Sequence, residues 1–141
     1  MKLYFLRHEK TIPNDMAAVT KGPIITMRED AKGDDRLLAH EAFHAHQWWA
    51  CLAACVGLGL LLPLQLTVGM GLFGLFAHGA LYAAVKPYRK WSEVFAYRIQ
   101  INGHPDPDFP RRAAVALATG YGLGIDENEA RRLLRIKASK A

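Results

Sequence analysis

A stretch of 44 residues, from Ala42 to Val85, contains no aspartate, glutamate, lysine or arginine. A charge-free segment of this length has to be buried in the protein, covered by a partner or placed in a membrane, because large apolar surfaces are unfavourable in water. Pro63 interrupts the stretch, and proline interrupts helices. We therefore expect an apolar helical hairpin over about residues 48–85, with one arm on each side of the proline.

An H-E-x-x-H sequence lies at residues 40–44, where the charge-free stretch begins. Apolar residues recur at helical spacing around it, and Asp34 or Asp35 can cap the first turn, so we expect a helix that begins near Arg36. Side chains four residues apart share one face of a helix. The spacing therefore lets the two histidines offer imidazole nitrogens to one tetrahedral Zn²⁺.

His40 and His44 alone are too few for a catalytic zinc site, which usually has three protein ligands and one open position. Glu93 is the best candidate for the third ligand, because it follows the apolar hairpin on a separate helix, expected over residues 91–101. Glu41, beside the histidines, can accept a proton from a water molecule that the metal activates.

Glu93 begins an E-x-x-A sequence. A helix with H-E-x-x-H followed by a helix with E-x-x-A resembles the gluzincin class of zinc metallopeptidases. The likeness is closest to its minimal members and to membrane-linked members with an apolar helical hairpin between the motifs, and it covers about residues 24–101. It implies that His40, His44 and Glu93 bind zinc and that Glu41 is the general base in peptide-bond hydrolysis.

The same resemblance implies roles for residues around the metal. Residues 24–27 would form the edge strand against which an extended peptide substrate pairs. Gln47 occupies a polar position that can orient a zinc ligand. Tyr97 stands where many gluzincins carry an acidic residue, and its hydroxyl can accept a hydrogen bond from His40 or stabilise an oxyanion. Apart from the resemblance, the hydroxyl of Tyr121 is a second candidate to stabilise the oxyanion.

The other elements complete a small α+β domain. Strands are expected at residues 2–6 and 24–27, and a basic helical tail over about residues 111–141 closes the chain. The expected helices of this tail are 111–119 and 127–137. We predict one domain, residues 1–141, of minimal zincin type: mainly helical, with a small N-terminal β-sheet and the apolar hairpin between the two metal-binding helices.

The charge of the chain lies mostly in its last part. The net charge is +5, and residues 86–141 hold eleven basic and six acidic side chains. Arg131, Arg132 and Arg135 alternate with apolar residues and follow acidic ones, which is typical of a solvated helix face. We therefore expect no nucleic-acid partner.

The apolar hairpin is compatible with two locations of the protein, at a membrane or in the cytoplasm. A crossing needs about 20 apolar residues, so the 36 residues from 50 to 85 barely make two crossings and a turn. A single crossing would separate His44 from Glu93, so the number of crossings is zero or two. The basic residues at 86–90 favour a membrane-associated protein with its site on the cytoplasmic side. The alternative is a cytoplasmic protein whose hairpin is buried by its own helices or by a second copy in a homo-oligomer.

The two cysteines, too few for a disulfide scaffold, indicate a reducing compartment.

Two other functions fit part of the sequence. The main alternative is a non-catalytic membrane-associated or oligomeric helical scaffold with a structural or vestigial zinc site. Residues 6–11 also resemble the start of the histidine phosphatases, but Glu9 stands where that family has glycine. The sequence favours a zinc metallopeptidase that acts on a peptide or protein substrate.

Overall fold

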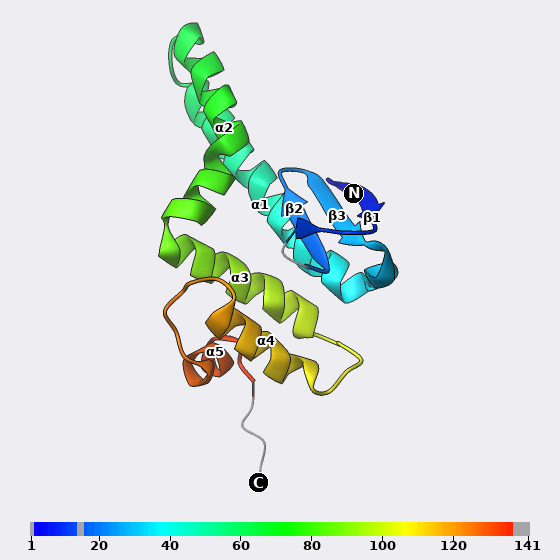
Figure 1. The fold of residues 1–141 in the computed structure, drawn as a ribbon. Coiled ribbons are helices and arrows are strands. Elements are labelled where there is room, and N and C mark those ends of the chain that lie inside the picture. Colours follow the sequence, from blue (N-terminus) through cyan, green and yellow to red (C-terminus); the bar gives the residue numbers. More distant parts are fainter. Residues whose placement is uncertain (1, 14–15, 137–141) are drawn as a thin grey trace.

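The computed structural model describes residues 2–13 and 16–136. In these residues a three-stranded sheet is followed by five α-helices (Figure 1). The elements are β1 (Phe5–Glu9), β2 (Ala18–Lys21), β3 (Ile24–Arg28), the short 3-10 helix η2 (Glu29–Ala31), α1 (Asp35–Gly59), α2 (Leu64–Ala84), α3 (Lys86–Ile101), α4 (Phe109–Thr119) and α5 (Glu127–Leu133). The expected α+β class, mainly helical with a small N-terminal sheet, is confirmed.

β3 is the central strand, in a sheet of order β1-β3-β2. β1 runs parallel to β3 and β2 runs antiparallel to it. Ile25 and Met27 of β3 are buried in one cluster with Ala45 of α1. Alternate residues of a strand point to the same face, so this face of the sheet packs on α1 and the sheet lies along the first half of that helix (Figure 1).

Two expectations about the strands are wrong. Residues 24–27 do not form an edge strand, because β3 is paired on both sides; among the described residues the terminal strand that contacts α1 is β2, which the sequence analysis missed. The first strand lies at Phe5–Glu9 and not at residues 2–6, because its register with β3 places Phe5 opposite Ile24.

α1 carries the H-E-x-x-H sequence and the first arm of the hairpin in one continuous helix of 25 residues. Its start agrees with the expectation: the Asp34 side chain accepts hydrogen bonds from the backbone N–H groups of Arg36 and Leu37. α2 packs back along α1, and Gly74 makes the close approach possible. A Cβ atom at Gly74 would lie 2.9 Å from the Cβ atom of Cys55.

α3 begins at Lys86, five residues before the expected start. Pro87 stands in the first turn of α3, a position that proline fits because its missing N–H would have no helical partner there. α4 and α5 then pack on α3 through a buried cluster that includes Val94, Leu117 and Leu134.

The last helix is shorter than expected. α5 ends at Leu133, whose carbonyl accepts a hydrogen bond from Arg98 Nε at 2.9 Å. Arg135 then adopts a left-handed φ of 58°, which stops the helix. The expected end at Lys137 lies outside the described residues.

Candidate metal centre

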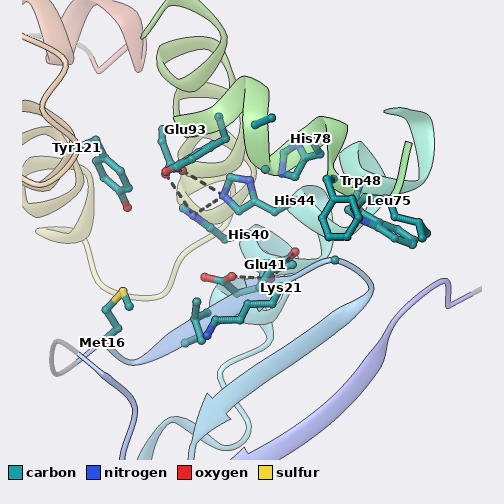
Figure 2. Close-up of a pocket in the computed structure, with 18 residues that line it drawn as sticks. Met16, Lys21, His40, Glu41, His44, Trp48, Leu75, His78, Glu93 and Tyr121 are labelled. Carbon is teal, nitrogen blue, oxygen red and sulfur yellow. Dashed lines mark hydrogen bonds and ion pairs between the residues drawn. The ribbon is translucent and has the colours of Figure 1, made fainter. Parts of the chain in front are cut away.

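Three buried side chains from two helices meet below the hairpin. His40 and His44 lie one turn apart on α1, and Glu93 reaches them from α3 (Figure 2). The two Nε2 atoms are 3.3 Å apart, and the Glu93 oxygens lie 3.7 Å from His40 Nε2 and 3.4 Å from His44 Nε2. A tetrahedral zinc with bonds of about 2.0–2.1 Å holds its ligand atoms about 3.3–3.4 Å apart. The two nitrogens therefore have the spacing of two ligands of one zinc ion, and each has a Glu93 oxygen at a similar distance, Oε2 for His40 and Oε1 for His44.

The charges of this group also suit a cation. Burial lowers the pKa of His40 to about 3 and lowers the pKa of His44, so both rings are neutral near pH 7. Burial raises the pKa of Glu93 to about 7. Glu93 Oε2 is buried without a hydrogen-bond partner among the described residues. The lone pairs of the two imidazole nitrogens and of the Glu93 carboxylate converge in a buried place, where a metal ion would stabilise them. The residues present therefore fit a metal ion.

The ring orientation of His44 is fixed by two buried neighbours. Its Nδ1 lies 3.1 Å from Gln47 Oε1 and 3.1 Å from Ser92 Oγ. Ser92 uses its own hydroxyl proton to donate to Gln47 Oε1 at 2.6 Å. Both oxygens therefore face His44 as acceptors, and Nδ1 carries the ring proton. The lone pair of His44 Nε2 is then free for a metal, so Gln47 has the orienting position expected for it.

His40 has less polar support. The buried Gln100 side chain on α3 interacts with its ring with a geometry short of a full hydrogen bond, and Nδ1 has no hydrogen-bond partner among the described residues. The Tyr97 ring packs edge-on against His40 at 4.7 Å between centroids. The Tyr97 hydroxyl is hydrogen-bonded to Tyr121 at 2.9 Å. Tyr97 therefore contacts His40 through its ring.

Glu41 is held in place by a contact with the sheet. Thr20 of β2 donates its hydroxyl to Glu41 Oε2 at 2.7 Å, and the same hydroxyl lies 3.1 Å from the Glu41 carbonyl. Burial raises the pKa of Glu41, whereas the bond from Thr20 lowers it. The result is a buried carboxylate with one fixed oxygen near the two histidines (Figure 2).

Two tyrosines contact Glu93. Tyr82 of α2 donates to Glu93 Oε1 at 2.6 Å, and Tyr121 interacts with the same carboxylate. Burial raises the pKa of Tyr121 above its ordinary value and that of Tyr97 to about 12. All three hydroxyls are hydrogen-bonded to one another or to Glu93, and those of Tyr97 and Tyr121 keep their protons at neutral pH.

A cavity of about 640 Å³ opens beside the three ligands. Its walls come from β2, α1, α2 and α3, and Glu41 and Tyr121 line it together with the ligands (Figure 2). Tyr97 lines a second, smaller cavity of about 280 Å³ on the other side of His40. The larger volume is in the range of pockets that hold small molecules or a few residues of a peptide.

The remaining histidines of α1 and α2, the two cysteines and the phosphatase-like segment are placed differently relative to this centre. His46 is exposed on another side of α1. His78 lines the larger cavity, and its Nδ1 is hydrogen-bonded to the Tyr88 hydroxyl at 2.8 Å. Cys51 and Cys55 are free thiols. Arg7, from the phosphatase-like segment, pairs with Glu9 at 3.2 Å on β1, outside both cavities.

The sequence analysis missed Thr20, Ser92 and Tyr82. Ser92 precedes Glu93 directly and gave a weak signal, because a small hydroxyl next to a ligand often supports the site. Thr20 is 21 positions from Glu41 and lies on a strand that was not expected.

Comparison with protein-family models, with curated proteins and with solved structures found no match to this chain. The assignment therefore rests on the arrangement of the described side chains: a buried His-His-Glu group that could hold a metal ion, of the kind found in zincin-like sites.

Proposed function

We propose that this protein is a zinc-dependent metallopeptidase. The observation that supports the proposal best is the grouping of His40, His44 and Glu93, whose ligand atoms lie within 4.8 Å of one another beside a cavity that Glu41 also lines. Three protein ligands next to open space match a catalytic zinc site, whereas structural zinc sites are usually closed by four protein ligands.

Zinc is the metal that the donor set favours. Two imidazole nitrogens and one carboxylate oxygen form a mixed set of intermediate softness, which suits zinc better than magnesium or calcium. No cysteine belongs to the group. Zinc held by His40, His44 and Glu93 would polarise a substrate carbonyl and lower the pKa of water.

Glu41 is the general base of the proposed reaction. Burial raises its pKa toward the working pH, which suits a group that takes a proton and returns it. It accepts the proton of the attacking water and passes it to the nitrogen of the leaving amine. The bond from Thr20 holds one carboxylate oxygen, so the other is available for this transfer.

β2 takes the substrate-binding role first assigned to residues 24–27. It is the terminal strand on this side of the described sheet, and its residues 18–21 line the cavity. The unpaired edge of a strand can bind an extended peptide through backbone hydrogen bonds. A peptide on β2 would pass beside Glu41.

The test compares zinc content and hydrolysis of a fluorogenic peptide library in three proteins. We expect one zinc per chain in the wild type and in Glu41→Gln, with hydrolysis lost only in the latter. Glu129→Gln, which changes a half-buried partner of Lys90 away from the metal centre, controls for loss of a carboxylate and should keep both properties. Zinc without hydrolysis in the wild type would support the scaffold alternative and overturn the peptidase proposal.

A further inference from the structure

The hairpin exposes its apolar side chains beyond the folded body. Figure 1 shows the end of α1 and the start of α2 projecting past the sheet and the other helices. At the tip, Leu60 is 71% exposed and Leu61 82%. α2 contains a segment, Leu66–Ala84, that is long and apolar enough to cross a membrane, and 11% of it is buried. Water is an unfavourable surrounding for such a surface.

The exposed surface surrounds much of α2. At about 100° per residue, Leu64, Leu72, Phe73 and Leu66 lie at successive positions over about 200° of the helix, and all four are exposed. A second copy packs along one stripe of a helix, about 100° wide. Lipid chains surround a helix on every free side. The width of the surface therefore favours lipid over another copy of the chain.

The first arm is too short to cross a bilayer. Trp48 and Trp49 tie α1 to the body, because their indole N–H groups donate to the carbonyls of Leu75 and Leu3 at 2.8 and 2.6 Å. From Trp49 to Leu62 is 14 residues, about 21 Å at 1.5 Å per residue. The hydrocarbon core is about 30 Å thick. The arm can therefore enter the bilayer and end within its hydrocarbon core, short of the opposite surface.

The second half of α2 belongs to the body. His78 and Gly79 line the cavity beside the ligands, and Tyr82 is bonded to Glu93. Only the first half of α2 therefore projects from the body, although the helix as a whole is long enough to span a membrane.

Positive charge follows the hairpin directly. Lys86 is exposed and forms no ion pair with the described residues, and Arg89 is fixed by bonds to the carbonyls of Tyr82, Ala83 and Tyr121. Basic residues next to an inserted segment are attracted to anionic lipid headgroups.

We propose that the hairpin inserts into an anionic bilayer from one side without crossing it, and that the metal centre lies just outside the lipid. Neither two crossings nor burial of the hairpin in a dimer agrees with its length and its exposed surface. The proposal concerns the hairpin alone and does not depend on peptidase activity.

Flotation of the full chain with vesicles tests the insertion. We expect wild-type protein to float with vesicles of phosphatidylcholine and phosphatidylglycerol, and less with phosphatidylcholine alone. Leu61→Glu should reduce binding by about tenfold or more, because it places a charge in hydrocarbon. Phe5→Glu, at a position 71% exposed on β1, is the matched control and should bind like the wild type. Equal binding of Leu61→Glu and wild type, or no flotation, would overturn the proposal.

A label at the tip tests the depth. Leu61→Cys carrying a bimane label, with equally treated wild type as background, should be quenched by lipids brominated on their chains. A water-soluble quencher trapped inside the vesicles should not reach it. Quenching from inside would show a crossing and contradict insertion from one side. A lipid-free dimer that Leu61→Glu dissociates would assign the surface to a second copy.

Discussion

The Thr20 hydroxyl and Glu41 Oε2 are 2.7 Å apart, and this contact joins the terminal strand of the sheet to the candidate base. The same strand lines the cavity. A substrate that pairs with β2 would therefore bind to the element that also holds Glu41, so that substrate position and base position are coupled.

Thr20→Val should lower hydrolysis about tenfold and leave the zinc content unchanged. The bond from Thr20 lowers the Glu41 pKa, so its loss raises that pKa further. Because the base works in its unprotonated form, the activity lost on acidification should then be lost at higher pH than in the wild type. A rate–pH profile measures the shift. Thr20→Ser keeps the hydroxyl and should behave like the wild type; an unshifted profile in Thr20→Val would refute the contact's role.

Zinc affinity should depend on pH through Glu93. Its pKa is raised to about 7 in the metal-free site, so zinc must displace a proton below pH 7, whereas His40, with a pKa of about 3, is already unprotonated. We expect affinity to fall about tenfold per pH unit below 7 and to level off above it. Competition with a chromogenic chelator at several pH values measures this. In Glu93→Gln the affinity should be much weaker, and a steep slope retained there would point to the histidines as the titrating groups.

Removal of zinc should lower the melting temperature by about 10 °C, relative to protein with zinc in 100-fold to 1,000-fold excess over Kd. The ion would join α1 to α3, and a ligand that binds only the folded state stabilises that state. Differential scanning fluorimetry with and without chelator gives the shift. His44→Ala should show no shift on chelation, and a shift of the same size in that variant would place the metal elsewhere.

Gln47→Leu should weaken zinc binding about 10-fold to 100-fold, because the acceptor that orients His44 is lost. Isothermal titration with zinc measures the change. His46→Gln changes an exposed side chain one position away and should bind zinc like the wild type. Loss of zinc in His46→Gln would instead make His46 a ligand.

Tyr121→Phe should lower kcat about 10-fold to 100-fold with little change in KM, if the Tyr121 hydroxyl at the cavity stabilises the oxyanion. Tyr97→Phe should have a smaller effect, since Tyr97 lines the other cavity and contacts the Tyr121 hydroxyl. Steady-state kinetics of both variants compare the two residues. The reverse order of effects would support the catalytic role that the sequence assigned to Tyr97.

Local patterns predicted much of the centre. The spacing of His40 and His44 follows from the period of a helix, and Asp34 marks the start of that helix. Glu93 was found by its motif, and the hairpin that brings it back was indicated by Pro63 and the absence of charge. These features depend on neighbours a few residues apart.

Long-range pairing explains the errors. The central place of β3 depends on parallel pairing with β1, which no pattern within residues 24–27 reveals. The contact of Thr20 with Glu41 likewise depends on how the sheet packs on α1. The early start of α3 was not predicted although its signal is local: Pro87 stands in the first turn of the helix, a position that proline fits.

The hydrogen bond from Thr67 to the Gly59 carbonyl, 2.6 Å long, joins residues eight positions apart, whereas Glu93 follows His40 by 53 positions. Closing a long loop costs more chain entropy than closing a short one. Once this short turn has formed and α2 has paired with α1, the end of α2 already lies beside the histidines. We therefore expect the hairpin to form first at its tip and α2 then to pair with α1 progressively toward the histidines. Each step closes only a short loop, so folding should be fast although the ligands are far apart in the chain.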